Sequence, residues 1–184
     1  MVSLNQLSWC NNQREMVFMD DGAAMTKGTA LEGTNTNTLG AATGTPVALK
    51  DWNTLKALLG FSVFLPTGLP TGSCLLSASG AVRNAVSGSN FTLTYLLTDQ
   101  TALTLTQVPQ GDKQVAFQCS AMPNISVSGS VARMAGNGTP TAGVQICTGT
   151  HGTTNITFSA NWDKQKSWEF FQDLQPNENW MPHT

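Results

Sequence analysis

Charged residues are scarce in this chain. Of its 184 residues, 11% are Asp, Glu, Lys or Arg, less than half of the roughly 25% typical of soluble domains. The net charge is −2, and Lys and Arg form no cluster. Because several convergent cations are needed to neutralise phosphates, we expect no nucleic-acid partner. Attraction of a polybasic face to a membrane surface is equally unsupported.

Long apolar runs are also lacking. No stretch approaches the roughly 20 residues that span a bilayer, and residues 1–8 have neither the basic nor the apolar region of a signal peptide. We therefore expect contact with a membrane only through an anchor outside this sequence, preceding Met1 in the full-length protein.

Motifs for catalysis, cofactors and metals are lacking as well. The sequence contains no dinucleotide-binding or phosphate-binding glycine loop and no nucleophile elbow. The two histidines, His151 and His183, have no evident partner for acid–base chemistry and are expected at the surface. Asp20-Asp21-Gly22 is followed by apolar residues instead of calcium ligands, so it predicts a turn. We expect no cofactor, no metal site and no catalytic residues, and hence not an enzyme.

One acidic pair keeps a carbohydrate hypothesis open. Glu169 and Asp173 are close in sequence to Trp162, Trp168 and Trp180. Two carboxylates beside sugar-stacking aromatic rings are the groups that glycoside chemistry uses. The alternative interpretation is that these rings pack in the core or in a hairpin.

Four widely spaced cysteines indicate disulfides. Zinc sites use ligands two to four residues apart, and no such pair is present. Cys119 and Cys147 are the preferred pair because both occupy strand-like positions in the C-terminal half, which leaves Cys10 and Cys74. Buried free thiols remain an alternative. Together with a surface rich in Thr, Ser, Asn and Gly, the even cysteine count favours an extracytoplasmic protein.

The N-terminal part reads as an appendage. Apolar runs at 4–9 and 16–19 predict a strand pair or β-hairpin within residues 1–22. Residues 23–47 are rich in Gly, Thr and Asn and have no hydrophobic period, which predicts a long loop or linker. A single helix-plus-sheet domain is expected over residues 48–174, followed by a frayed tail at 175–184.

One amphipathic helix is predicted within residues 48–60. Trp52, Leu55, Leu58 and Leu59 recur at the spacing of one helical face, with Asp51 or Asn53 as the N-terminal cap and Gly60 at the C-terminal end.

The remainder alternates as β-structure. We predict strands at residues 61–65, 74–82, 91–97, 102–108, 115–119, 125–127, 131–134, 144–148, 156–162 and 168–171. The fold class is α+β: a curved, mostly antiparallel sheet, or half-barrel, packed on one main helix.

The order of helix, Pro/Gly turn and hairpin resembles a family of uncharacterised bacterial extracytoplasmic domains, found in lipoproteins and in the outer portions of anti-sigma factors. The matching residues are Leu59-Gly60-Phe61, Val63, Leu65-Pro66, Leu69-Pro70, Gly72, Leu93-Thr94-Tyr95, Asp99 and Leu103-Thr104-Leu105-Thr106-Gln107, with further similarity at 127–132, 156–162 and 168–171. The resemblance covers residues 48–174 and implies a half-barrel like those of lipoprotein carriers. It carries no functional residues.

These observations predict a non-enzymatic, extracytoplasmic binding or sensory module of a lipoprotein or membrane regulator. An apolar ligand or a segment of a partner protein would lie on the concave face of the sheet, near Phe61, Phe64, Leu65, Leu69 and Tyr95. The alternative function is a cell-surface adhesion or carbohydrate-binding β-domain that uses exposed Trp side chains.

Overall fold

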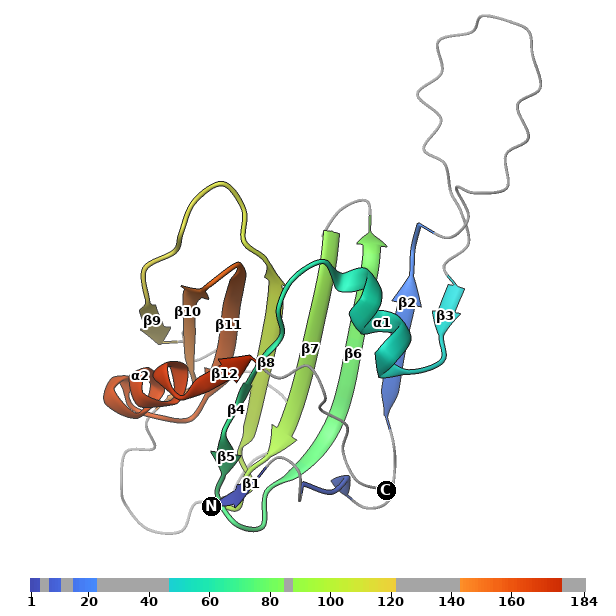
Figure 1. Cartoon of the computed structure of the whole chain (residues 1–184). Helices are drawn as coiled ribbons and strands as arrows, with labels where there is room; N and C mark the ends of the chain where they lie inside the picture. The colour runs from blue at the N-terminus through green and yellow to red at the C-terminus, as the bar shows by residue number, and fades with distance from the viewer. Residues whose placement is uncertain (4–6, 11–14, 23–46, 85–87, 122–142, 177–184) are drawn as a thin grey trace, which may run out of the picture.

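The computed structural model describes residues 1–3, 7–10, 15–22, 47–84, 88–121 and 143–176. Its centre is an open sheet of eight strands in the order β3-β2-β6-β7-β8-β11-β10-β9, not closed into a barrel (Figure 1). These strands are β2 (Met16–Asp20), β3 (Val47–Leu49), β6 (Cys74–Asn84), β7 (Gly88–Leu96), β8 (Ala102–Pro109), β9 (Gln118–Ala121), β10 (Gln145–His151) and β11 (Thr154–Ala160).

All neighbouring strands in this sheet are antiparallel except β2 and β6, which are parallel. The sheet is therefore mixed but rich in antiparallel pairs, and the α+β class is confirmed. Of the predicted strands, those at 125–127 and 131–134 lie outside the described residues, as do residues 23–46 of the predicted linker.

Alternation of apolar and hydroxyl side chains separates the two faces of the sheet. In β7, Phe91, Leu93 and Tyr95 are buried while Thr92 and Thr94 are only partly covered. The neighbouring strands β8 and β11 repeat this pattern, because successive side chains of a strand point to opposite faces. The apolar face carries the core, and we call it the inner face.

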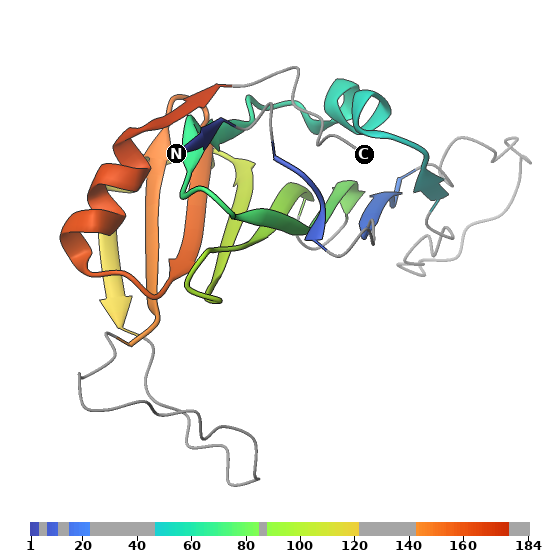
Figure 2. The same cartoon turned by 90° about the horizontal axis from the view of Figure 1, so that it is seen from below.

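Both helices lie on the inner face (Figure 2). A Cβ atom at Gly80 of β6 would meet the side chain of Leu55, which belongs to α1 (Trp52–Leu59). A Cβ atom at Gly149 of β10 would meet the ring of Phe171, which belongs to α2 (Lys164–Gln172). Glycine at these two positions therefore lets each helix approach the sheet closely.

Helix α1 matches the predicted helix, with one error in its buried face. The Asp51 carboxylate accepts a hydrogen bond from the Thr54 N–H at 2.8 Å, and Gly60 ends the helix with a φ of 74°. Trp52, Leu55 and Leu59 are buried, but Leu58 is 41% exposed. The predicted stripe was thus one residue too wide.

Helix α2 overturns two predictions, the strand at 168–171 and the single main helix. Asp163 caps α2 by accepting a hydrogen bond from the Lys166 N–H at 2.7 Å. One face of the helix packs on the sheet through Phe171, and Phe170 is partly buried against the core. The aromatic run therefore occupies helical positions on the inner face.

The predicted N-terminal hairpin and appendage are also wrong. Strand β1 (Val2–Ser3) pairs with β5 (Gly68–Leu69), whereas β2 joins the main sheet beside β6. Leu7, Trp9 and Phe18 are buried in the core cluster. The reason is physical: these apolar side chains are buried in the same core as those of the sheet and the helices, so the described N-terminal residues belong to the same packed unit.

Two disulfides tie the chain together, and all four cysteines are paired. Cys119 and Cys147 face each other on β9 and β10, so the preferred pair is confirmed. Cys10 and Cys74 close a second link across 64 residues and fix the N-terminal segment to the start of β6. Disulfides are typical of oxidising, extracytoplasmic compartments. Within the described residues, no helix is long and apolar enough to cross a bilayer.

Candidate functional site

A short strand on the inner face provides one wall of the candidate site. Strand β4 (Phe64–Pro66) is held by Gln107 of β8. The Gln107 side chain accepts a hydrogen bond from the Phe64 N–H and donates one to the Phe64 carbonyl, both at 2.7 Å. Gln107 is fully buried, and these two bonds satisfy both ends of its amide.

Three further contacts hold the segment around β4. The Thr154 hydroxyl donates to the Ser62 carbonyl at 2.5 Å. The His151 ring stacks on Phe64 with centroids 5.1 Å apart, and its Nε2–H donates to the Phe171 carbonyl at 2.7 Å. A carbonyl only accepts, so Nε2 carries the proton. His151 thus links β4 to the C-terminal end of α2 from β10, where it is partly buried, whereas the sequence predicted a surface position with no evident partner.

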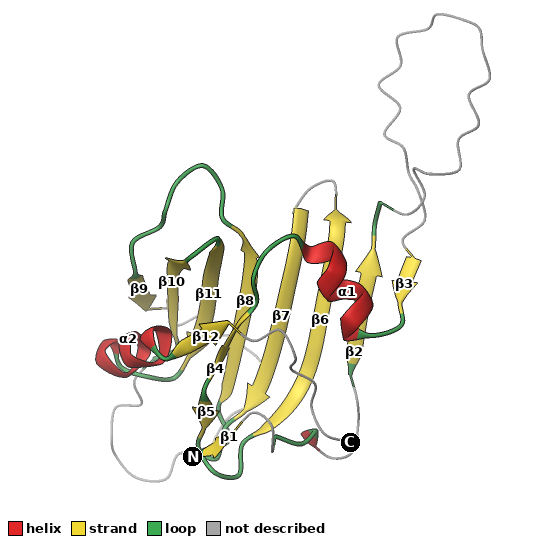
Figure 3. Ribbon diagram, in the orientation of Figure 1, coloured by secondary structure: helices red, strands yellow, loops and turns green. Residues whose placement is uncertain are grey.

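The other wall is α2 itself, which is followed by β12 (Leu174–Pro176). Strand β12 pairs with β4, Leu174 lying opposite Pro66, so the predicted frayed tail is ordered up to residue 176 (Figure 3). The remainder, 177–184, lies outside the described residues and includes Trp180 and His183.

A half-open pocket of about 190 Å³ lies between these walls. It is lined by Met1, by the segment Pro66, Thr67, Gly68, Leu69 and Pro70, and by Trp162, Lys166, Glu169, Phe170 and Asp173. Its lining is mostly apolar. Leu69 and Trp162 are buried, whereas Lys166, Glu169 and Asp173 are exposed, so the pocket has an apolar floor and a charged rim.

Lys166 is the one residue with a cationic side chain in the lining of this pocket, and that side chain contacts an aromatic ring. The Lys166 ammonium lies over the Trp162 ring, 4.8 Å from its centroid, within the range of a cation–π interaction. The charge of Lys166 also acts on the Asp99 carboxyl. The pKa of Asp99 is lowered, first by the hydrogen bond from the Thr101 hydroxyl at 2.6 Å and in smaller part by Lys166.

The two carboxylates of the rim lie at the C-terminal end of α2. Glu169 accepts a hydrogen bond from the Gln165 side chain at 2.9 Å, and Asp173 is the cap residue of the helix. The described helix α2 has no basic residue in its last turn. Both acidic side chains therefore lie near the negative end of the helix dipole, an unfavourable arrangement that a cation would relieve.

The predicted groove residues fall into two groups. Leu69 lines the pocket. Phe64, Leu65 and Tyr95 are buried in the core, and Phe61 is partly buried against it. Burial raises the pKa of the Tyr95 hydroxyl far above its usual range. The pocket thus includes Leu69 and its neighbours in Pro66–Pro70, but the helix that lines it is α2 and not the predicted helix.

Three of the eleven residues that line the pocket, Lys166, Glu169 and Phe170, belong to α2, where the sequence predicted a strand at 168–171. Its signal was present: Asp163 precedes Lys164–Gln172, and an Asp three residues before the Lys166 N–H is a typical helix cap. Glu169 and Asp173, which the sequence places close to the tryptophans, do line the same pocket as Trp162. Among the described residues, no group of three His, Cys, Asp or Glu side chains could hold a metal.

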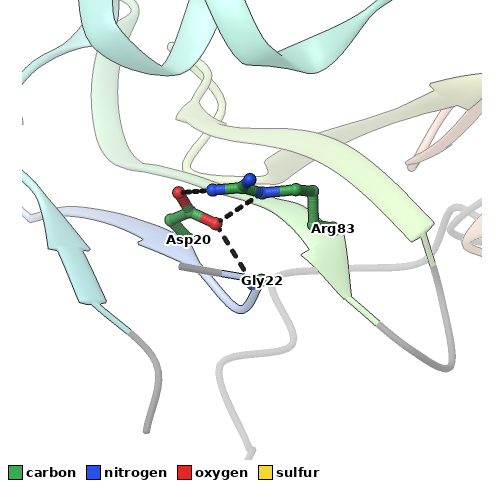
Figure 4. Close-up of polar contacts among 3 residues, drawn as sticks. All are labelled: Asp20, Gly22 and Arg83. Atoms are coloured by element: carbon green, nitrogen blue, oxygen red, sulfur yellow. Dashed lines mark hydrogen bonds and ion pairs between the residues drawn. The ribbon is translucent and has the colours of Figure 1, made fainter. Parts of the chain in front are cut away.

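A second polar cluster joins β2 to β6, near the β3 edge of the eight-stranded sheet (Figure 4). The buried Asp20 carboxylate accepts hydrogen bonds from the Arg83 side chain, through Nε at 3.0 Å and through Nη2, and from the Gly22 N–H at 3.1 Å. Arg83 has a φ of 55°, in the left-handed region. A Cβ at Gly22 would meet the Arg83 side chain at 2.6 Å, so this turn requires glycine.

No family model and no curated protein matches the sequence, and no solved structure matches the fold.

Proposed function

We propose that this protein is an extracytoplasmic binding or sensory module, not an enzyme, and that it holds a side chain of a partner protein in the pocket between Pro66–Pro70 and α2. The observation that best supports this proposal is the composition of the pocket. Its apolar floor includes Leu69, Trp162 and Phe170 and is bounded by charged side chains. Ligand sites typically combine such an apolar lining with a few polar groups.

The size of the pocket favours a side chain over a whole small molecule. Its volume of about 190 Å³ is below the roughly 300–1,000 Å³ of sites that enclose drug-sized ligands. A half-open pocket of this size accommodates one anchoring group while the rest of the partner lies outside.

The carbohydrate alternative has weaker support. It requires exposed Trp rings, but Trp9, Trp52 and Trp162 are at most 7% exposed, and Trp168 is 37% exposed. The Trp162 ring that lines the pocket has the Lys166 ammonium over one face. A sugar ring stacking on that face would have to displace the ammonium.

The cellular setting is part of the same proposal. Two disulfides support an extracytoplasmic location. The resemblance to lipoprotein and anti-sigma-factor domains supports a membrane-anchored protein with a half-barrel fold, and the open sheet with both helices on its inner face is compatible with that shape.

Filling the pocket tests the proposal. Thr67 lines the pocket and is exposed, so Thr67→Trp is expected to fill the pocket without disturbing the core. In ¹H–¹⁵N spectra recorded with increasing 2-phenylethanol, a neutral probe the size of an aromatic side chain, we expect binding to be at least about threefold weaker in this variant than in the native protein. The matched control is Thr157→Trp, an exposed position on the other face of the sheet. Equal binding of 2-phenylethanol by wild type and both variants would contradict the proposal.

A further inference from the structure

The outer face of the sheet, opposite the inner face, carries a regular grid of hydroxyl side chains. Strands β7, β8 and β11 are neighbours within the sheet, and each contributes two outward-facing residues. We call these six residues the hydroxyl grid: Thr92, Thr106 and Thr157 form one row in register, and Thr94, Thr104 and Ser159 form the other. Thr157 is exposed and the other five are partly exposed. Both helices lie on the inner face (Figure 2), so neither covers the grid.

The residues of the grid are more uniform than a sheet requires. Any antiparallel sheet spaces its outward side chains by about 4.8 Å between strands and by about 6.8 Å along a strand. High β-propensity explains individual Thr residues in strands, but not two complete rows. The strands β7, β8 and β11 contain no charged residue over their whole length. The regular spacing is therefore combined with one repeated, uncharged chemical group.

This repeated group defines the ligand. A hydroxyl donates one hydrogen bond and accepts two. The Thr92 and Thr106 oxygens lie 3.1 Å apart, so one such bond joins them within their row, and the remaining capacity is directed to an incoming ligand. A matching ligand is uncharged, both donates and accepts hydrogen bonds, and repeats in two directions. The surface of ice has all three properties, and the oxygens of its prism faces repeat at intervals close to those between outward side chains of a sheet.

We propose that the hydroxyl grid binds the surface of ice, a function independent of the pocket and of the partner proposed above. The Thr methyl groups lie against the lattice, and the hydroxyls bond to its outermost waters. Neighbouring strands are rotated by about 20–25°, so a flat crystal face matches about two or three strands, which is the width of the grid. The lack of charge is part of the fit, because stripping the hydration shell from a charged side chain costs free energy.

The recrystallisation of ice tests the proposal, because a protein adsorbed on ice stops small grains from feeding large ones. We expect the wild-type protein to keep the grains of an annealed frozen film small. Thr106→Lys places a charge in the middle of one row and should require at least about a tenfold higher protein concentration for the same effect. Thr157→Lys, at the exposed end of that row, should act in the same direction. The matched control is Thr153→Lys, an exposed position in the turn between β10 and β11, which should behave as wild type.

Circular dichroism melting curves establish that each variant is folded. Grains that coarsen with the wild type as fast as with an equal concentration of serum albumin would overturn the inference, as would equal potency of the wild type and both grid variants. A second copy of the chain is the competing occupant, since hydroxyls are self-complementary. Dimers in sedimentation velocity that Thr106→Lys separates, with no effect of the wild type on ice, would assign the face to self-association and overturn the inference too.

Discussion

At the scale of single residues, Gln107 decides where the wall of the pocket lies. The alternation of β8 places Gln107 on the same face as Leu103 and Leu105, so its inward direction follows from the sequence. The sequence does not identify the partner of Gln107. Phe64 is 43 residues away, and only folding brings its backbone N–H and carbonyl to within 2.7 Å of the Gln107 amide. A polar residue in an apolar row signals that some partner exists but does not identify it.

Removing the two hydrogen bonds between Gln107 and Phe64, which we call the clamp, should destabilise the protein strongly. In Gln107→Leu the volume is kept, but the N–H and carbonyl of Phe64 lose their partner in a buried place. We expect the free energy of unfolding to fall by about 2–5 kcal/mol, since each unsatisfied buried group costs about 1–3 kcal/mol. Urea denaturation measures the change, with the exposed Gln118→Leu as control. A loss within 0.5 kcal/mol, roughly that of an ordinary surface substitution, would show that the clamp is not needed.

At the scale of elements, the two helices differ in how far sequence predicts them. Helix α1 has a cap, an amphipathic period and a terminal glycine, and all three are confirmed. Helix α2 has a cap, but its run Trp168-Glu169-Phe170-Phe171 is short and aromatic, a composition that strands also favour. Tertiary packing decides between helix and strand: the Phe171 ring packs on β10 at Gly149, where there is no side chain in the way. Because α2 was misread, the pocket could not be placed from the sequence.

The cap of α1 should make part of the stability depend on pH. The pKa of Asp51 is lowered, chiefly by the hydrogen bond from the Thr54 N–H and then by that from the Thr54 hydroxyl. A carboxyl with a lowered pKa in the folded state stabilises the protein above its unfolded pKa of about 3.9. This stabilisation is lost as the pH falls through the lower, folded value.

Asp51→Asn, which keeps a capping side chain without the charge, is therefore expected to flatten the dependence of the melting temperature on pH between 2 and 5. Circular dichroism at a series of pH values measures this. The control is Asp112→Asn, an exposed acidic residue outside α1. A pH profile identical to that of wild type would show that the ionised cap adds nothing to stability.

At the scale of the whole molecule, the sequence predicts the class and the strands of the central hairpins, but not the role of the N-terminal residues. Strand β2 is parallel to β6 and is joined to it through Asp20 and Arg83, while Cys10–Cys74 ties the preceding segment to the start of β6. These are contacts across more than 60 residues. Local patterns of hydrophobicity and turn residues carry no information about such pairings, so the sequence predicts an appendage where the structure has part of the core.

The N-terminal residues also reach the site. Strand β1 pairs with β5, and Met1 lines the pocket together with the residues of β5 and α2. The pocket is thus assembled from the beginning, the middle and the end of the described chain. Such an assembly depends on the complete fold, which the two disulfides help to hold.

The most direct test of the account is a map of where a small apolar probe binds to the wild-type protein. In a series of ¹H–¹⁵N spectra recorded with increasing 2-phenylethanol, we predict saturable shifts concentrated at the amides of Thr67, Gly68, Lys166 and Phe170, which surround the pocket. Shifts centred instead on Thr92, Thr106 and Thr157, on the opposite face of the sheet, or no saturable shift at all, would contradict the assignment of this pocket as the binding site.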